Sequence, residues 1–97
     1  MKIAIASEGK DENARISMTA GRAPYYIIAE DEKIVKVISN PFFHGGGRAG
    51  PGVAEILSKE GVELVVAGNI GPNMKMALQT KGIRFEEKMG TVKDVLR

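Results

Sequence analysis

A buried strand, a glycine-containing turn and the start of a helix follow one another in Glu63-Leu64-Val65-Val66-Ala67-Gly68-Asn69-Ile70-Gly71-Pro72-Asn73. After Glu63, the next four positions form a short apolar run of the kind found in strands that are covered on both faces. Pro72 suits the first turn of a helix, where a backbone N–H has no partner. A strand that leads directly into a helix predicts an α/β domain with parallel strands.

The same patterns extend outward to both ends of the chain. Strands are expected at residues 2–6, 25–30, 33–39, 63–67 and 83–86, and helices at 51–60, 72–81 and 91–96. Strand-helix-strand crossovers link parallel strands in a right-handed sense, whereas the hairpin at residues 25–39 makes the second strand antiparallel. The sequence therefore predicts a mixed five-stranded sheet of order 3-2-1-4-5, flanked by helices, in a single domain covering residues 1–97.

Composition limits the classes of partner. The net charge is only +2, and the basic residues are scattered, so we expect no nucleic-acid binding, which needs a concentrated basic surface. The chain has no Cys, which excludes disulfides, thiolate zinc sites and protein-thiolate ligation of iron–sulfur clusters. The short apolar start at residues 1–6 is neither a signal peptide nor a membrane span, so we expect a cytoplasmic protein without membrane partners.

Two long connections enter the sheet edge at which the parallel strands end. The first spans residues 7–24 and ends in Gly21-Arg22-Ala23-Pro24, which would bring a guanidinium group to that edge. Structureless loops longer than roughly 12 to 15 residues are uncommon in compact domains and are often functional. We therefore expect a ligand site at the switch point between strands 1 and 4, where open α/β sheets usually bind ligands.

The second connection, residues 40–50, contains His44-Gly45-Gly46-Gly47-Arg48 and leads into the helix predicted at 51–60. Accessible glycine N–H groups, a helix N-terminus and the Arg48 charge together favour an anion. The run is not a P-loop, because no Lys-Ser/Thr pair follows the glycines, and it lacks the G-x-G-x-x-G spacing of a dinucleotide site.

The turn at residues 67–73 is a second helix start that would suit an anion. Gly68 and Gly71 allow close approach of the backbone, and Asn69 can present an amide group. The same glycines would equally suit a tight strand-to-helix turn that contacts no ligand, and both interpretations stay open.

Metal ligands are few in this sequence. His44 is the only histidine and is expected to be exposed, which makes it the candidate metal ligand. The methionines at positions 18, 74, 76 and 89 are soft ligands in principle, but we expect them to pack in the core or at its rim. Ser7 and Ser17 have no evident His-acid pair, so we expect a binding protein and not an enzyme.

Five motifs in the same order resemble the dinitrogenase iron-molybdenum cofactor biosynthesis family, the NifX/NafY-type domain. They are the start at residues 1–7, Gly21-Arg22-Ala23-Pro24-Tyr25-Tyr26, Asn40-Pro41, the glycine-rich loop through Gly50-Pro51, and residues 67–73. The resemblance implies a ribonuclease H-like sheet and a small accessory or carrier protein that binds an iron-molybdenum or iron–sulfur cofactor, its precursor or a related oxyanion.

The resemblance also implies the contacts. Carried onto this chain, they are Arg22, His44, Arg48 and Asn69, with the amides of Gly45, Gly46, Gly47, Gly68 and Gly71 beside them. Thr19 and Ala20 stand where family members often carry His-Phe. A partner protein in cofactor or iron–sulfur assembly is a further expectation. The alternative is a protein-interaction or regulatory module without a metal cargo, in which an exposed Phe42-Phe43 pair contacts the partner.

Overall fold

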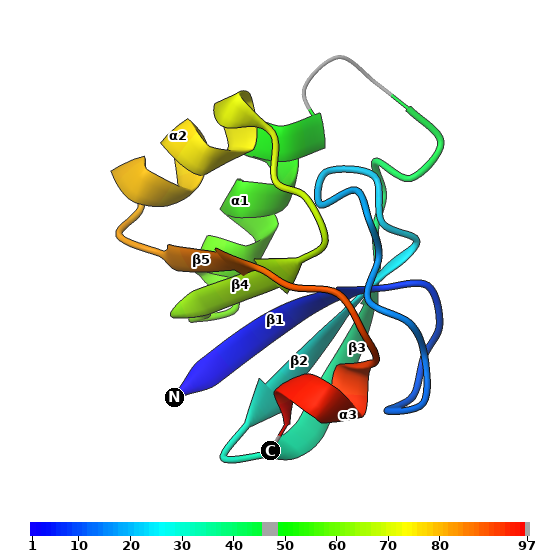
Figure 1. Ribbon diagram of the computed structural model, residues 1–97. Coiled ribbons are helices and arrows are strands. Elements are labelled where there is room, and N and C mark those ends of the chain that lie inside the picture. The colour runs from blue at the N-terminus through cyan, green and yellow to red at the C-terminus, as the bar shows by residue number, and fades with distance from the viewer. Residues whose placement is uncertain (46–48, 97) are drawn as a thin grey trace.

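Five strands pair in the order β3-β2-β1-β4-β5 (Figure 1). The computed structural model describes residues 1–45 and 49–96. The elements are β1 (Lys2–Ser7), β2 (Tyr25–Glu30), β3 (Lys33–Ser39), α1 (Ala49–Lys59), β4 (Leu64–Ala67), α2 (Pro72–Thr80), β5 (Arg84–Glu87) and α3 (Val92–Val95). β2 is antiparallel to β1 and β3, whereas β4 is parallel to β1 and β5. The predicted strand order and directions are therefore confirmed.

One helix begins earlier than the sequence suggested. α1 starts at Ala49, two residues before the predicted start at Pro51. The first turn of a helix has N–H groups without intrahelical partners, so a proline is tolerated at its third residue as well as its first. Gly50 therefore belongs to the helix and not to the preceding loop, which matters for the site below.

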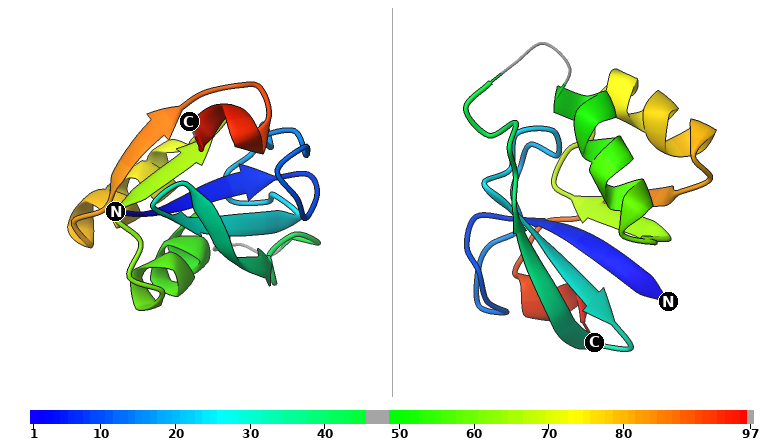
Figure 2. Two further views of the ribbon diagram at one scale, coloured as in Figure 1. Left: turned by 90° about the horizontal axis from the view of Figure 1, so that it is seen from below. Right: turned by 180° about the vertical axis from the view of Figure 1, so that it is seen from behind.

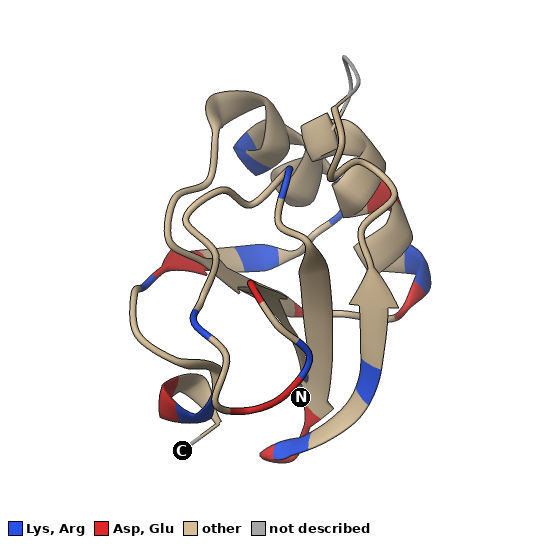
Figure 3. Ribbon diagram, turned by 90° about the vertical axis from the view of Figure 1, so that its right-hand side faces the viewer, with Lys and Arg blue, Asp and Glu red and all other residues tan. Residues whose placement is uncertain are grey.

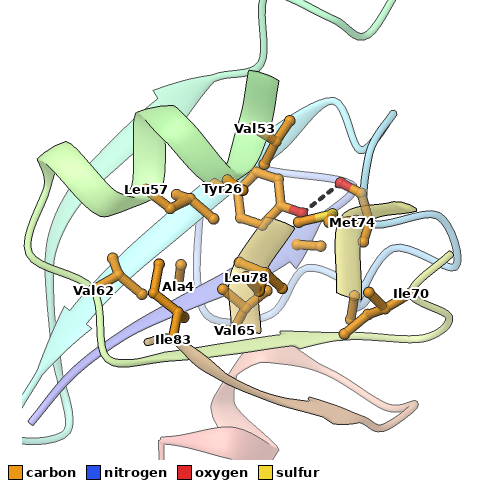
Figure 4. Packing of buried hydrophobic residues seen from close by; sticks show 14 of the residues in the cluster. Ala4, Tyr26, Val53, Leu57, Val62, Val65, Ile70, Met74, Leu78 and Ile83 are labelled. Atoms are coloured by element: carbon orange, nitrogen blue, oxygen red, sulfur yellow. Dashed lines mark hydrogen bonds between the residues drawn. The ribbon is translucent and has the colours of Figure 1, made fainter. Parts of the chain in front are cut away.

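The larger core lies between the sheet and the pair α1 and α2. Alternate residues of β1 and β2, such as Ala4, Ala6 and Tyr26, point to this face and meet Leu57 from α1 and Leu78 from α2 (Figure 4). All five side chains are buried. The strand alternation of period two thus selects which residues face these helices.

A second, smaller core lies on the opposite face of the sheet. Ile5, Ile27 and Val66 point to this side and are covered by Val92 of α3 and by Ile16 of the first long connection. Figure 2 shows α3 on one side of the sheet and α1 on the other. The connection at residues 8–24 is therefore packed against the sheet, whereas the sequence suggested only a long loop.

Two local features fit the hairpin predicted at residues 25–39 and the helix predicted at residues 91–96. Asp31 and Glu32 form the hairpin turn with φ values of 52° and 70°, the left-handed conformation that two-residue hairpins of type I′ require. At the start of α3, the Asp94 carboxylate accepts a hydrogen bond from the backbone N–H of Thr91 at 2.9 Å, as a capping box does.

Lys and Arg residues are interspersed with Asp and Glu residues along the ribbon, as Figure 3 shows for one side. Five ion pairs of opposite charge lie on the surface of the described residues, including Lys36–Glu60 and Lys81–Glu55, each at 2.8 Å. Across residues 1–45 and 49–96, none of the helices combines the length and apolar character needed to cross a membrane.

Tyr26 connects the main core to the first long connection. Its ring is buried and its hydroxyl donates a hydrogen bond to the carbonyl of Ala20 (Figure 4). Burial raises the pKa of the Tyr26 phenol above its ordinary value. The folded state therefore holds this group neutral.

This burial predicts a specific loss of stability in alkali. The unfolded chain releases the phenol proton above about pH 10, whereas the folded chain retains it, so the free energy of unfolding falls as the pH rises beyond that value. Tyr26→Phe should lower stability at pH 7 by about 1 kcal/mol and should lose less additional stability between pH 10 and 11.5 than the wild type does. Urea unfolding across this pH range measures both effects, and Tyr25→Phe is the control. If the free energy of unfolding fell equally steeply with pH in wild type and in Tyr26→Phe, the buried phenol of Tyr26 would not be the cause of the alkaline loss.

Candidate functional site

A cavity of about 300 Å³ lies at the end of the sheet where β1 and β4 finish. Three segments that are distant in the chain form its walls. They are residues 19–22 of the first connection, residues 49–50 at the start of α1, and the turn and first residues of α2, namely Asn69 and residues 71–74. The chain turns to opposite sides from β1 and β4, so their loops diverge and leave space between them.

Glycines let the three walls approach one another. A Cβ atom on Gly21 would lie 3.3 Å from the backbone nitrogen of Gly50, and one on Gly50 would lie 2.9 Å from the Cβ atom of Met74. The backbone N–H of Ala20 donates to the carbonyl of Asn69 at 3.1 Å, which joins the first connection to the turn before α2. The cavity walls are therefore fixed by main-chain contacts.

The electrostatic environment of the cavity favours a negative ligand. The N-termini of α1 and α2 both reach it, and neither helix carries an acidic residue in its first turn. Gly71, the N-cap of α2, offers no side-chain acceptor to the first N–H groups of that helix. Among the described residues that line the cavity, Arg22 is the single charged one. Helix N-termini and a guanidinium group are both established ways of binding anions.

Glu87 holds the turn before α2 in place. Its carboxylate accepts a hydrogen bond from the backbone N–H of Ile70 at 2.9 Å and lies 3.7 Å from the Lys75 ammonium. Because Ile70 already donates to this carboxylate, the amides left for a ligand are those of the helix start itself. β5 thus supports the cavity from outside.

The buried residue Asn40 joins the two long connections. Its side-chain amide donates to the carbonyls of Gly21 and Ala23, at 3.0 and 2.9 Å, and its side-chain oxygen accepts from the N–H of Phe42 at 2.9 Å. Those two carbonyls flank Arg22 in the chain. Asn40 therefore fixes the backbone that carries the arginine, a role that the sequence did not indicate.

Asn40→Ala should lower the free energy of unfolding by about 2 kcal/mol, because it leaves two buried carbonyls and one N–H without these partners. Chemical denaturation measures the loss. Asn13→Ala, which changes an exposed asparagine of the first connection, is the matched control and should stay within about 0.5 kcal/mol of wild type. Equal stability of the two variants would contradict the clamping role.

The structure brings together some of the predicted contacts and separates others. Arg22, Asn69 and Gly71 line the cavity, and Gly45 lies close to Arg22, since a Cβ on Gly45 would be 3.5 Å from the guanidinium. His44 is exposed, as expected, and its ring stands 4.8 Å from that of Phe43. It does not line the cavity but is adjacent in sequence to Gly45.

Gly68 lies outside the cavity, because the sulfur atoms of Met18 and Met89 cover it. The predicted contacts Gly46, Gly47 and Arg48 lie outside the described residues. Thr19, Ala20, Gly50 and Met74 line the cavity without having been singled out as contacts.

The aromatic pair in the second connection is only half exposed. Phe43 is 44% exposed, but the Phe42 ring packs over Gly52 of α1, where a Cβ would come within 2.2 Å of the ring. Phe42 also contacts the main core. The expectation of two exposed phenylalanines is therefore wrong for Phe42, because its ring packs over a glycine of α1 that has no side chain to keep the ring away.

The protein groups that line the cavity suit a bound molecule whose surface atoms accept hydrogen bonds. Within the part of the chain that the structure describes, no three His, Cys, Asp or Glu side chains gather as a metal-binding group would. The cavity instead offers backbone N–H groups, the amides of Asn69 and Asn73, the Thr19 hydroxyl and the Arg22 guanidinium. An anionic cluster or an oxyanion fits this donor set better than a bare metal ion does.

The chain is thus a small α/β domain with a cavity at the switch point of its sheet, and the described lining of this cavity suits an anion. The chain belongs to the dinitrogenase iron-molybdenum cofactor family, whose model matches residues 1–97. This membership associates the chain with the iron-molybdenum cofactor and confirms the family resemblance of the sequence. No curated protein sequence matches the chain significantly.

Solved structures agree with the assignment. A protein from Thermotoga, provisionally described as NifB, is 33% identical, with a TM-score of 0.79 over 98% of this chain and 83% of that one. The apo form of the orange protein from Desulfovibrio gigas superposes with a TM-score of 0.90 at 24% identity, covering 98% of this chain and 82% of the other. At 24% identity, the similarity to the orange protein shows the fold alone.

Proposed function

We propose that this protein is a carrier that binds an anionic iron-molybdenum or iron–sulfur cluster, or its precursor, in the cavity between the N-termini of α1 and α2. The observation that supports the proposal is the convergence of two helix N-termini and Arg22 on a cavity of about 300 Å³, whose lining includes no carboxylate among the residues that the structure describes. Family membership supports the choice of cargo.

The chemistry of such a cargo matches the donors of the cavity. Metal–sulfide and metal–oxide clusters carry their negative charge on outer sulfur and oxygen atoms, which accept hydrogen bonds from N–H groups. Two helix N-termini supply such groups together with about half a positive charge each, and Arg22 supplies a full charge. A cluster held in this way needs few covalent ligands, so the chain can bind it without cysteine and release it to a partner.

His44 is the proposed direct ligand to a metal of the cargo. It precedes Gly45, whose backbone lies beside Arg22 at the rim of the cavity. A neutral imidazole is a common ligand for iron, and an exposed position leaves it able to turn toward a bound cluster. We propose binding and transfer of the cargo as the activity, without a catalysed reaction.

Anaerobic mixing with isolated iron-molybdenum cofactor tests the proposal. The protein should co-elute in gel filtration with iron and molybdenum at about one cofactor per chain. His44→Ala should retain part of the binding and alter the absorption spectrum of the bound cluster, whereas Lys59→Ala, which changes an exposed residue at the end of α1, should bind as wild type does. Failure of the wild type to retain metal would refute the proposal. Molybdate as a second probe distinguishes a cluster from a simple oxyanion.

A further inference from the structure

Two exposed methionines from different loops meet beside the cavity. A Cβ atom on Gly68 would lie 2.6 Å from the sulfur of Met89 and 2.8 Å from the sulfur of Met18. Both thioethers therefore rest against one point of the backbone just after β4. Neither methionine lines the cavity, although Thr19, which follows Met18, and Asn69, which follows Gly68, do.

Main-chain hydrogen bonds hold the two methionine segments on either side of Gly68. The Gly68 N–H donates to the carbonyl of Ser17 at 2.8 Å, and the Lys88 N–H donates to the carbonyl of Ala67 at 2.8 Å. Residues 17–18 and 88–89 therefore flank residues 67–68. Glycine has no side chain to fill the space between them, so the two sulfur atoms can approach each other there.

Packing alone does not account for this arrangement. Met18 is 55% exposed and Met89 is 51% exposed, so each leaves about half of its surface in water. The remaining methionines have other environments: Met74 is buried in the core, the Met1 sulfur accepts a hydrogen bond from Arg84 at 2.8 Å, and Met76 projects from α2 with 63% exposure. The expectation that the methionines at positions 18, 74, 76 and 89 pack in the core or at its rim is met most clearly by Met74, which is buried in the core.

We propose that Met18 and Met89 together bind one soft monovalent metal ion of the Cu(I) type. Thioether sulfur is a soft, polarisable ligand that selects Cu(I) over zinc, magnesium or calcium. The two sulfur atoms come from backbone segments that are already fixed relative to each other, so little ordering is needed to bring both to one ion. The site uses different side chains from the anion cavity and does not depend on the proposed cargo.

Silver ion, a redox-inert analogue of Cu(I), tests the site in protein labelled with ¹³C at the methionine methyl groups. Titration with silver nitrate in chloride-free buffer should shift the Met18 and Met89 methyl resonances together and reach saturation near one equivalent. The Met76 resonance should stay in place and serves as the internal control for an exposed methionine. Zinc ion should shift neither Met18 nor Met89.

Conservative variants separate a joint site from independent thioethers. Met18→Leu and Met89→Leu should each weaken silver binding at least tenfold, whereas Met76→Leu should leave it unchanged. Leucine keeps a similar volume, and the amide spectrum of each variant reports that the fold is retained. Equal shifts at Met76, or undiminished binding in either single variant, would overturn the proposal, as would silver binding that moves no methionine resonance.

Discussion

Replacing Arg22 by glutamate is expected to weaken binding of the anionic cluster by on the order of 100-fold, since a charged hydrogen bond contributes about 1.5 to 3 kcal/mol and the new carboxylate repels the ligand. Within residues 1–45 and 49–96, Arg22 is the one charged residue that lines the cavity. Its backbone is held by the Asn40 amide through the carbonyls on either side. The substitution therefore reverses the charge of the site, while the hydrogen bonds from Asn40 to the flanking carbonyls do not involve the replaced side chain.

Arg15→Glu is the matched control for this substitution. Arg15 is exposed and lies in the same connection, but it does not line the cavity. Its replacement by glutamate changes the net charge by the same amount as Arg22→Glu does. Anaerobic titration followed by cluster absorption should give a wild-type dissociation constant for Arg15→Glu at moderate salt. A similar loss in both variants would mean that overall charge drives binding, and unchanged binding in Arg22→Glu would exclude this cavity as the site.

Gly50→Val is expected to lower the free energy of unfolding by about 2 kcal/mol, or the melting temperature by roughly 10 °C. A Cβ atom at this position would lie 2.9 Å from the Met74 Cβ and 3.2 Å from its Cα and backbone nitrogen. Backbone atoms cannot rotate away as a side chain can, so α1 and α2 must separate. Because both helix N-termini form the cavity, cluster binding should fall in parallel with stability.

Gly71→Ser provides the control at the other helix start. A side chain at Gly71 meets nothing within 4 Å, and its backbone is in an extended conformation that any residue adopts. Serine is also a favourable N-cap residue, so the stability of this variant should match or slightly exceed that of wild type. The melting temperatures of Gly50→Val and Gly71→Ser, measured by thermal unfolding, check both expectations. A small effect of Gly50→Val would show that the two helices are not in fixed contact there.

The order of the strands could be predicted because it depends on local patterns. Short apolar runs marked the strands, Pro72 marked a helix start, and the charged pair Asp31-Glu32 marked the hairpin. Crossover handedness then left few ways to arrange five strands. The early start of α1 could not be predicted, because Pro51 suits the third residue of a helix as well as its first.

The candidate site could be placed only in part. Topology indicated the sheet edge, and the loop motifs supplied Arg22, Asn69 and Gly71. The hydrogen bonds of Asn40 and Glu87 were not visible, because each side chain meets a backbone group of a distant segment. Gly68 was placed in the site on sequence grounds, but Met18 and Met89 cover it.

The sequence by itself determined the fold, the family and the absence of cysteine ligands, because strand periodicity, helix boundaries and composition are properties of short segments. Tertiary structure alone decided which atoms face one another: that two helix N-termini without acidic first turns share a cavity with Arg22, and that two methionine sulfur atoms meet over Gly68. These contacts join loops that are remote in the chain. Their distances depend on how the helices pack on the sheet, which no local pattern specifies.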